Sequence, residues 1–360
     1  MKKLFILALS ILLSSCLKDD PLSKPFTSYI PVEINDGLLI STPQEQGIDP
    51  DILKDVYTQI HSDENLWSLR SMLVFKNGAL VAESYMKDDI YRTQPQMIWS
   101  CTKQVMGILA GIAVEEGVIS SIDDPMADYL DNIEDKYPDK AGITIRQLLT
   151  MHSGIDYNND GVGGQTDQVL RQIPEELTSF VLSRPIRADQ GSSFWYNDGD
   201  PQLVASLIQE TTGMPTDQWA DEVFFSKIGA SNYHWVRYKD GTTLGGYGIE
   251  TTPRELGKIA LCVADSGRYN NVQVVPTQWI AEMTSPQAET EADYDFGFYW
   301  WQEAQREIHF MWGHGGQFAF VVPAESLVVV MTSIPNTQGK YQILADEVLP
   351  VLDLIIEACQ

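Results

Sequence analysis

Residues 99–110 read WSCTKQVMGILA, and this stretch carries most of what the sequence predicts about fold and chemistry. The apolar run from Val105 onward is typical of a buried helix that begins close to Ser100. A spacing of three residues puts Ser100 and Lys103 on one face of that helix, one turn apart. Burial and the positive helix N-terminus both lower the pKa of a lysine, so its amine could take the serine proton. Backbone N–H groups at the same terminus could bind an oxyanion.

The pattern Ser-x-x-Lys is short, and a helix-capping serine followed by a solvated lysine would explain it as well. Five further blocks follow it along the chain. They are Glu116-Gly117-Val118 through Tyr129-Leu130, 143–155 (ITIRQLLTMHSGI), 194–198 (FWYND), 245–248 (GGYG) with 251–256 (TTPREL), and 313–317 (GHGGQ). The order of these blocks is more informative than any one of them.

Together the six blocks, within roughly residues 40–355, resemble the serine β-lactamase and penicillin-binding-protein superfamily. The resemblance is strongest to its class C, esterase and 6-aminohexanoate-dimer-hydrolase branch. It implies a β-lactamase/transpeptidase-like fold and a serine hydrolase that works through an acyl-enzyme, without a cofactor. The substrate would be a small ester, an amide or a peptide.

The resemblance also implies a role for each matched residue. Ser100 would be the acylated nucleophile, and Lys103 and Tyr196 would share the general-base and general-acid work. Neighbouring positive charge would hold Tyr196 near its anionic form. The backbone N–H groups of Ser100 and Gln317 would form the oxyanion hole, with Gly316 in the turn before Gln317.

Two departures from the family pattern bear on the substrate. The second motif, Tyr196-x-Asp198, ends in Asp where relatives have Asn, and an ionised Asp only accepts hydrogen bonds. Beside Lys103, Asp198 would keep the lysine charged and make Tyr196 the better base. His314 and Gly315 stand where relatives have Lys-Thr; His314 could donate to Tyr196 or to a bound carboxylate, but it anchors a carboxylate less well. Both changes favour an esterase or amidase over an efficient β-lactamase.

The hydrophobic pattern predicts an α+β fold built from both ends of the chain. Strands are expected at 71–75, 80–85, 297–302, 308–312, 318–323 and 327–332, with a hairpin turn at Asn77-Gly78. Helices are expected at 49–60, 105–116, 145–151, 175–182, 202–211, 217–225, 253–265, 277–283 and 341–358. We therefore predict an antiparallel sheet from residues 41–95 and 286–360, and a mainly helical part, 96–285, that carries Ser100 and Tyr196.

Composition excludes several classes of protein. The 360 residues include 50 Asp and Glu against 24 Lys and Arg, a formal net charge of −26, which argues against a nucleic-acid partner. An apolar fraction of 44% is enough for a large core and excludes a mainly disordered chain. No His-Glu-x-x-His or Cys-x-x-Cys pattern occurs, so no metal site is predicted. The oligomeric state does not follow from the sequence.

The first residues read MKKLFILALSILLSSC and resemble a bacterial lipoprotein signal. The apolar run of ten residues is too short for a membrane-spanning helix, which needs about 20. We expect residues 1–15 to be removed, Cys16 to carry the lipid, and residues 16–40 to form a tether to a membrane of the cell envelope. Residues 17–20 (LKDD) resemble the export signal of surface lipoproteins, which points to the outer-membrane surface.

Two other functions remain open on the sequence. A D-alanyl carboxypeptidase or penicillin-recognising protein would use the same motifs. A catalytically inactive surface lipoprotein could keep the fold as a binding module, although Ser100, Lys103 and Tyr196 all survive together.

Overall fold

The computed structural model describes residues 23–157, 159, 176–189, 191–290, 293–303, 305–335 and 342–360. The expected signal peptide, residues 1–15, and the expected lipidation site, Cys16, lie outside these ranges. No helix in the described ranges is long and apolar enough to cross a membrane.

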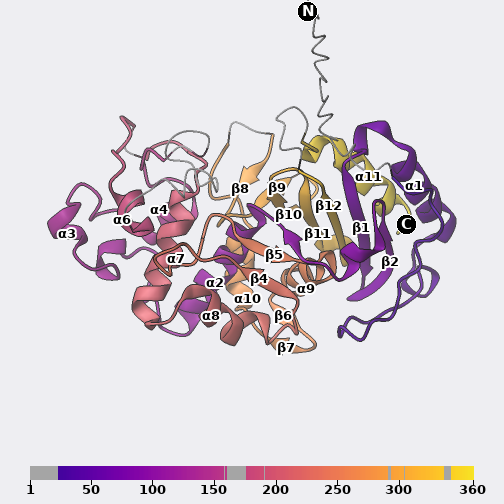
Figure 1. Cartoon of the computed structure of the whole chain (residues 1–360), viewed down its shortest axis with the longest axis horizontal. Coiled ribbons are helices and arrows are strands. Elements are labelled where there is room, and N and C mark those ends of the chain that lie inside the picture. Colours follow the sequence, from indigo (N-terminus) through magenta and orange to yellow (C-terminus); the bar gives the residue numbers. More distant parts are fainter. Residues whose placement is uncertain are drawn as a thin grey trace, which may run out of the picture.

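A seven-stranded antiparallel sheet forms the centre of the molecule (Figure 1), as the pattern predicted. Its strands lie in the order β2-β1-β12-β11-β10-β9-β8. Their bounds are Leu69–Lys76 (β1), Ala79–Tyr85 (β2), Asp295–Phe296 (β8), Trp301–Glu303 (β9), Ile308–Gly313 (β10), Gln317–Val322 (β11) and Leu327–Ser333 (β12). β1 pairs with β12 with Leu73 opposite Val330, so the two ends of the chain meet in mid-sheet.

Of two hairpin turns in this sheet, the sequence predicted the one between β1 and β2 but not the one between β8 and β9. Asn77 and Gly78 have φ of 52° and 82°, as the predicted two-residue turn between β1 and β2 requires. The single strand expected at 297–302 is wrong, because a turn separates β8 from β9. At this turn Gly297 lies so close to Met283 that a Cβ would sit 2.1 Å from its carbonyl oxygen, and Tyr299 has a φ of 65°. The aromatic residues there fill the core from a turn and not from an extended strand.

Helices cover both faces of the sheet. α1 (Pro50–Ser62) packs against α11 (Ala345–Glu357) on one side, and α9 (Pro253–Ala264) packs on β1, β11 and β12 on the other (Figure 1). Asp49 caps α1 by accepting from two backbone N–H groups, which explains why the helix starts at Pro50. α9 comes from the range expected to be the helical part, yet its buried side belongs to the sheet's core.

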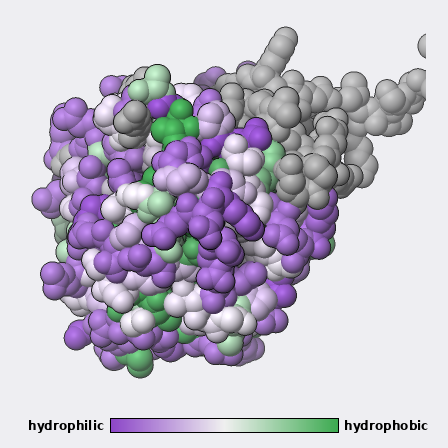
Figure 2. Space-filling view, turned by 90° about the vertical axis from the view of Figure 1, so that its left-hand side faces the viewer, coloured by the Kyte–Doolittle hydropathy of each residue, from purple (hydrophilic) through white to green (hydrophobic). Residues whose placement is uncertain are grey.

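The remaining helices lie on the other side of the sheet, with α2 and α10 in the middle of the molecule and the others toward its far end (Figure 1). The surface at that end is mainly hydrophilic with small separated apolar patches (Figure 2). These helices are α2 (Cys101–Glu115), α3 (Ile133–Lys136), α4 (Ile145–Leu149), α6 (Leu177–Leu182), α7 (Gly199–Thr212), α8 (Thr216–Ala220) and α10 (Thr277–Met283). α2 is buried over almost its whole length, as its apolar sequence indicates.

Two small sheets complete the fold, and the sequence did not predict them. They consist of β3 (Gln96–Met97), β5 (Ile249–Thr251) and β4 (Tyr233–Trp235), and of β6 (Arg268–Tyr269) with β7 (Val272–Gln273). Strands of two or three residues are too short for an alternating pattern to be recognised.

The described part of the expected tether, residues 23–40, lies along β2, the edge strand of the sheet. Lys24 N–H donates to Met86 O at 2.6 Å, and Tyr29 O accepts from Glu83 N–H at 2.8 Å. The segment covers a sheet edge that would otherwise offer unpaired backbone groups. Residues 23–40 are therefore part of the folded body and do not act as a free linker.

A buried ion-pair network fastens this segment to α9. Arg254, 1% exposed, bonds the carboxylates of Glu83 and Asp36 at 2.9 Å each and donates to Val32 O. Glu83 is also buried, so removal of the guanidinium would leave its carboxylate charge less well paired in the interior, which is destabilising.

We expect Arg254→Met to lower the free energy of unfolding by about 3–5 kcal/mol, measured by urea denaturation. Arg237→Met is the matched control, because Arg237 forms a comparable pair with Asp217 that is partly exposed. That control should cost about 0–1 kcal/mol. Equal losses in the two variants would show that the network adds nothing beyond a surface ion pair.

Candidate active site

The N-terminus of α2 presents Ser100. Ser100 occupies the N-cap position, partly exposed, and Trp99 before it has a φ of 53°, a left-handed conformation that is rare for a bulky residue. Cys101 and Thr102 donate their backbone N–H groups to Ile98 O and Trp99 O, which closes a tight turn. The N–H of Ser100 itself donates to no other residue in the part of the chain that the structure describes. It is therefore available to an oxyanion.

Lys103 lies one turn further on, fully buried. Its Nζ donates to Ser100 Oγ at 3.0 Å, to Asp198 Oδ1 at 2.5 Å and to Gly246 O at 2.8 Å. An ammonium group has three protons, and here each has an acceptor. The structure thus brings Ser100, Lys103 and Asp198 together as the sequence predicted, and adds the Gly246 carbonyl.

The charge on Lys103 differs from the first expectation. Burial lowers the pKa of Lys103, but the Asp198 carboxylate and Tyr196 outweigh burial and raise it above its usual value. The expectation that burial and the helix terminus leave the amine partly neutral is therefore wrong. The lysine rests as a cation held by Asp198, as the Asp in the second motif had suggested.

Tyr196 completes the group. Its ring centroid lies 4.8 Å from Lys103 Nζ, and Ser100 and Lys103 both act on its hydroxyl in the direction that lowers its pKa. Burial raises the pKa of Tyr196; Lys103 opposes this and Asp198 adds to it, and the net shift is upward. The expectation that neighbouring positive charge holds Tyr196 near its anionic form is wrong for the resting site. Tyr196 is a neutral phenol there, able to donate a proton.

The turn between β10 and β11 lies against the nucleophile. A Cβ on Gly313 would be 2.2 Å from Ile98 O and 3.2 Å from Cys101 Sγ, so only glycine allows this approach. Gly316 has a φ of 96°, and the exposed His314 packs its ring edge-on against Trp99 with centroids 5.2 Å apart. The turn that carries His314 is thus next to Ser100, and a bond from His314 to Tyr196 or to substrate stays a prediction.

Gln317 opens β11 beside the same turn. Its side-chain amide donates to Ser333 O at 2.9 Å and accepts from Ser333 N–H, which ties the turn to β12. Its carbonyl oxygen accepts from Cys101 Sγ at 3.5 Å. The side chain is committed to the fold, so any part of Gln317 in an oxyanion hole must be the backbone N–H.

Sequence reasoning missed two features of the site. Gly246 holds Lys103 through its carbonyl, and its lack of a side chain allows Asp198 to approach, since a Cβ would lie 2.7 Å from Asp198 Cβ. The block Gly245–Gly248 was recognised but given no role. Asp200, fully buried two residues after Asp198, was not singled out at all.

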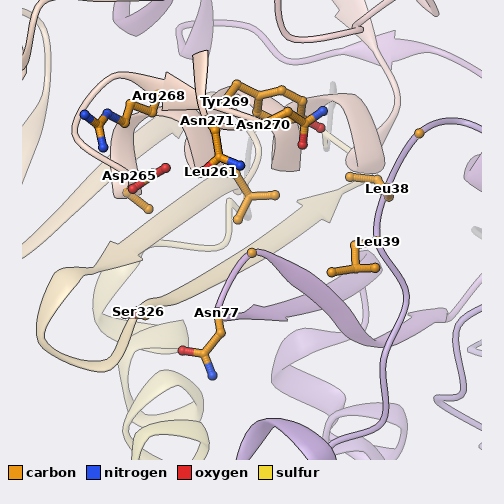
Figure 3. A pocket seen from close by; sticks show the side chains of 13 residues that line it. Leu38, Leu39, Asn77, Leu261, Asp265, Arg268, Tyr269, Asn270, Asn271 and Ser326 are labelled. Carbon is orange, nitrogen blue, oxygen red and sulfur yellow. The ribbon is translucent and has the colours of Figure 1, made fainter. Parts of the chain in front are cut away.

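A cavity of about 450 Å³ lies elsewhere, between the end of α9, the β6–β7 turn and the β1–β2 turn (Figure 3). Leu39, Asn77, Asp265 and Asn271 are among the residues that line it, and none of the expected catalytic residues does so. Across the described residues, no cluster of three or more His, Cys, Asp or Glu side chains could hold a metal ion.

Comparisons with known proteins fit this geometry. The model of the family described as Beta-lactamase matches residues 71–349. A putative 6-aminohexanoate-dimer hydrolase from Bacillus anthracis is similar in structure, with a TM-score of 0.72, 18% identity and coverage of 96% of this chain and 92% of that one. A putative beta-lactamase from Bacteroides dorei DSM 17855 has a TM-score of 0.71, 16% identity and coverage of 86% and 98%.

A family VIII carboxylesterase has a TM-score of 0.70 and 15% identity, with coverage of 87% of this chain and 99% of that one. At these identities the likeness concerns the fold. A comparison with curated protein sequences found no match.

Proposed function

The chain belongs to the beta-lactamase family, and on that premise we propose that it is a serine hydrolase that forms an acyl-enzyme on Ser100 with a small ester or amide. The observation that carries the proposal is the bond from Lys103 Nζ to Ser100 Oγ at 3.0 Å, in a lysine that also contacts Asp198. A serine hydroxyl next to a proton carrier and its counter-ion is the arrangement of an activated nucleophile.

Acylation follows from the protonation states of the resting site. As Ser100 Oγ attacks the substrate carbonyl, its proton passes to Lys103, which releases one of its own protons to Asp198, the anion in contact with it. The backbone N–H groups of Ser100 and Gln317 stabilise the oxyanion. Tyr196, a neutral phenol beside Ser100, protonates the leaving group and then regains a proton from Asp198 through Lys103. Water hydrolyses the acyl-serine by the same route in reverse.

The charge of the site supports a substrate without a carboxylate near the scissile bond. Asp198 adds a negative charge beside Lys103, so the pair has no net positive charge to attract an anion. His314 and Gly315 replace the Lys and Thr that hold a carboxylate in relatives. An ester or amide with a neutral or amine-bearing leaving group fits these residues better than a penicillin or a D-alanyl peptide.

Activity-based labelling tests this function. A fluorophosphonate should modify the wild-type protein at Ser100, located by peptide mass, and Ser100→Ala should be unlabelled and inactive on p-nitrophenyl esters. The same samples are tested with a cephalosporin and with D-amino-acid amides. Folded wild-type protein that stays unlabelled would overturn the proposal and favour a binding module. Stable acylation by the cephalosporin without ester turnover would favour a penicillin-recognising protein.

A further inference from the structure

Asp200 is a buried carboxylic acid that follows the turn Tyr196–Asp198, called here the catalytic turn. It lies in the first turn of α7 with no exposed surface, two residues after Asp198 and four after Tyr196. No step of the proposed reaction uses it. A carboxylate in such a place is costly unless it is compensated, so its presence calls for a physical explanation.

Asp200 joins the catalytic turn to the neighbouring segment Met151–Ile155. Ser153 Oγ donates to Asp200 Oδ1 at 2.6 Å and accepts from Ile155 N–H at 3.1 Å. On the other side, the backbone N–H of Asp200 donates to Asn197 Oδ1 at 2.7 Å. The Asn197 amide in turn donates to Trp195 O at 2.8 Å. The residues on both sides of Tyr196 are thus fixed through Asp200.

Its second oxygen is not compensated. Oδ2 of Asp200 is buried and accepts no hydrogen bond from any described residue, and the hydroxyl of Tyr299 is buried in the same condition. Burial raises the pKa of Asp200 to about 7, although the bonds with Ser153 and Asn197 act in the opposite direction. The neutral acid suits this environment, because it puts no charge on a buried oxygen that has no partner.

We propose that Asp200 is a positioning residue whose neutral form clamps the Tyr196–Asp198 turn to the Met151–Ile155 segment, and whose ionisation loosens that clamp and lowers turnover. The inference rests on the proposed function of the turn. It adds a group that never touches substrate and yet sets the alkaline limit of the reaction.

The titration of Asp200 itself, and not that of its neighbours, should govern the pH dependence of this clamp. Tyr299, from the turn between β8 and β9, has its pKa raised well above 10 by burial and then by Asp200, so it stays neutral. Tyr157, from the Met151 side, places its ring against Gly199. Lys103 on α2 and Asp198 in the same turn are charged, but they form an ion pair with each other. Arg146, on α4, pairs away from the turn with Asp123 and Glu282.

The sign of the effect follows from the raised pKa. The folded protein binds a proton on Asp200 that the unfolded chain releases near pH 4, so the stabilisation is fully present below that pH. It is lost as the pH rises through about 7. Asp200→Asn keeps an oxygen for Ser153 and cannot ionise, so it should mimic the neutral acid at every pH.

The test compares wild type and Asp200→Asn from pH 6 to pH 9. In wild type we expect the rate of ester turnover at saturating substrate to fall above pH 7 by up to about tenfold per pH unit, with KM little changed. In Asp200→Asn this fall should be absent. Asp265→Asn, an exposed carboxylate at the end of α9, is the control and should keep the wild-type profile. Ser153→Ala, which removes the clamp's donor, should lower turnover at all pH values.

Hydrogen exchange of the backbone over residues 194–203 gives a readout that needs no activity. At pH 8.5 this segment should exchange faster in wild type than in Asp200→Asn, and at pH 6 the two should match. Identical alkaline profiles and identical exchange in the two proteins would overturn the inference. Wild type that is inactive at every pH would instead overturn the proposed function, and the exchange comparison would still decide on the clamp.

Discussion

Lys103→Met should lower the rate of Ser100 acylation by about 10²–10⁴-fold, the range that positioned proton transfer contributes in enzymes. Methionine fills the same buried space, but it removes the only donor that links Ser100 Oγ to Asp198 in the hydrogen bonds described here. The serine proton then has no route to the anion. The measurement is the second-order rate constant of fluorophosphonate labelling, taken at a temperature well below the unfolding midpoint.

Lys258→Met is the matched control. Lys258 is as buried as Lys103, pairs with Glu255 at 3.0 Å, and donates to Asp36 O and Gly229 O, all away from Ser100. Both variants lose a buried ammonium group and should be less stable. Only the Lys103 variant should lose labelling. If it is labelled as fast as the control, Lys103 does not carry the serine proton.

The motifs that are local in sequence were predictable, because they depend on spacing. Ser100 and Lys103 meet one helical turn apart, and the Asn77-Gly78 turn needs only its two residues. The ordered blocks also identified Tyr196, Asp198 and the turn at Gly313 as parts of one site, and the structure places them around Ser100.

The protonation states were not predictable in the same way. They depend on groups brought together by the fold, since Asp198 and Gly246 lie 95 and 143 residues from Lys103. Burial alone would favour a neutral Lys103, and the positive charge of Lys103 alone would favour an ionised Tyr196. With Asp198 in contact, the result is a lysine cation and a neutral phenol. Which effect prevails follows only from distances.

The predictions of a free tether over residues 23–40 and of a strand at 297–302 were wrong for a related reason. Proline-containing polar sequence at residues 23–40 is typical of a linker, but Arg254 and the β2 edge supply partners that the local sequence does not show. The run at 297–302 is apolar enough for a strand, but Gly297 packs against Met283 and forces a turn. In both cases tertiary contacts override local pattern.

Asp198→Asn should shift the substrate preference toward molecules that carry a carboxylate. The substitution raises the charge of the Ser100–Lys103–Asp198 group by one unit without changing its size. At about 6 Å and an effective dielectric constant of about 20, one charge is worth roughly 3 kcal/mol, or at most a factor of about 100. Because Lys103 already neutralises part of this field, we expect about a tenfold change in preference.

The measurement uses a pair of substrates that differ only in the charge, a cephalosporin acid and its methyl ester. For each protein the ratio of the acylation rates, acid over ester, is determined, so that any general loss of activity cancels. The ratio should rise about tenfold from wild type to Asp198→Asn, and it should fall with added salt, as a charge effect requires. The substitution also removes the anion that accepts the serine proton through Lys103, so both acylation rates should fall, and the ratio removes this common loss. An unchanged ratio would mean that the loops around the site, and not Asp198, exclude carboxylates.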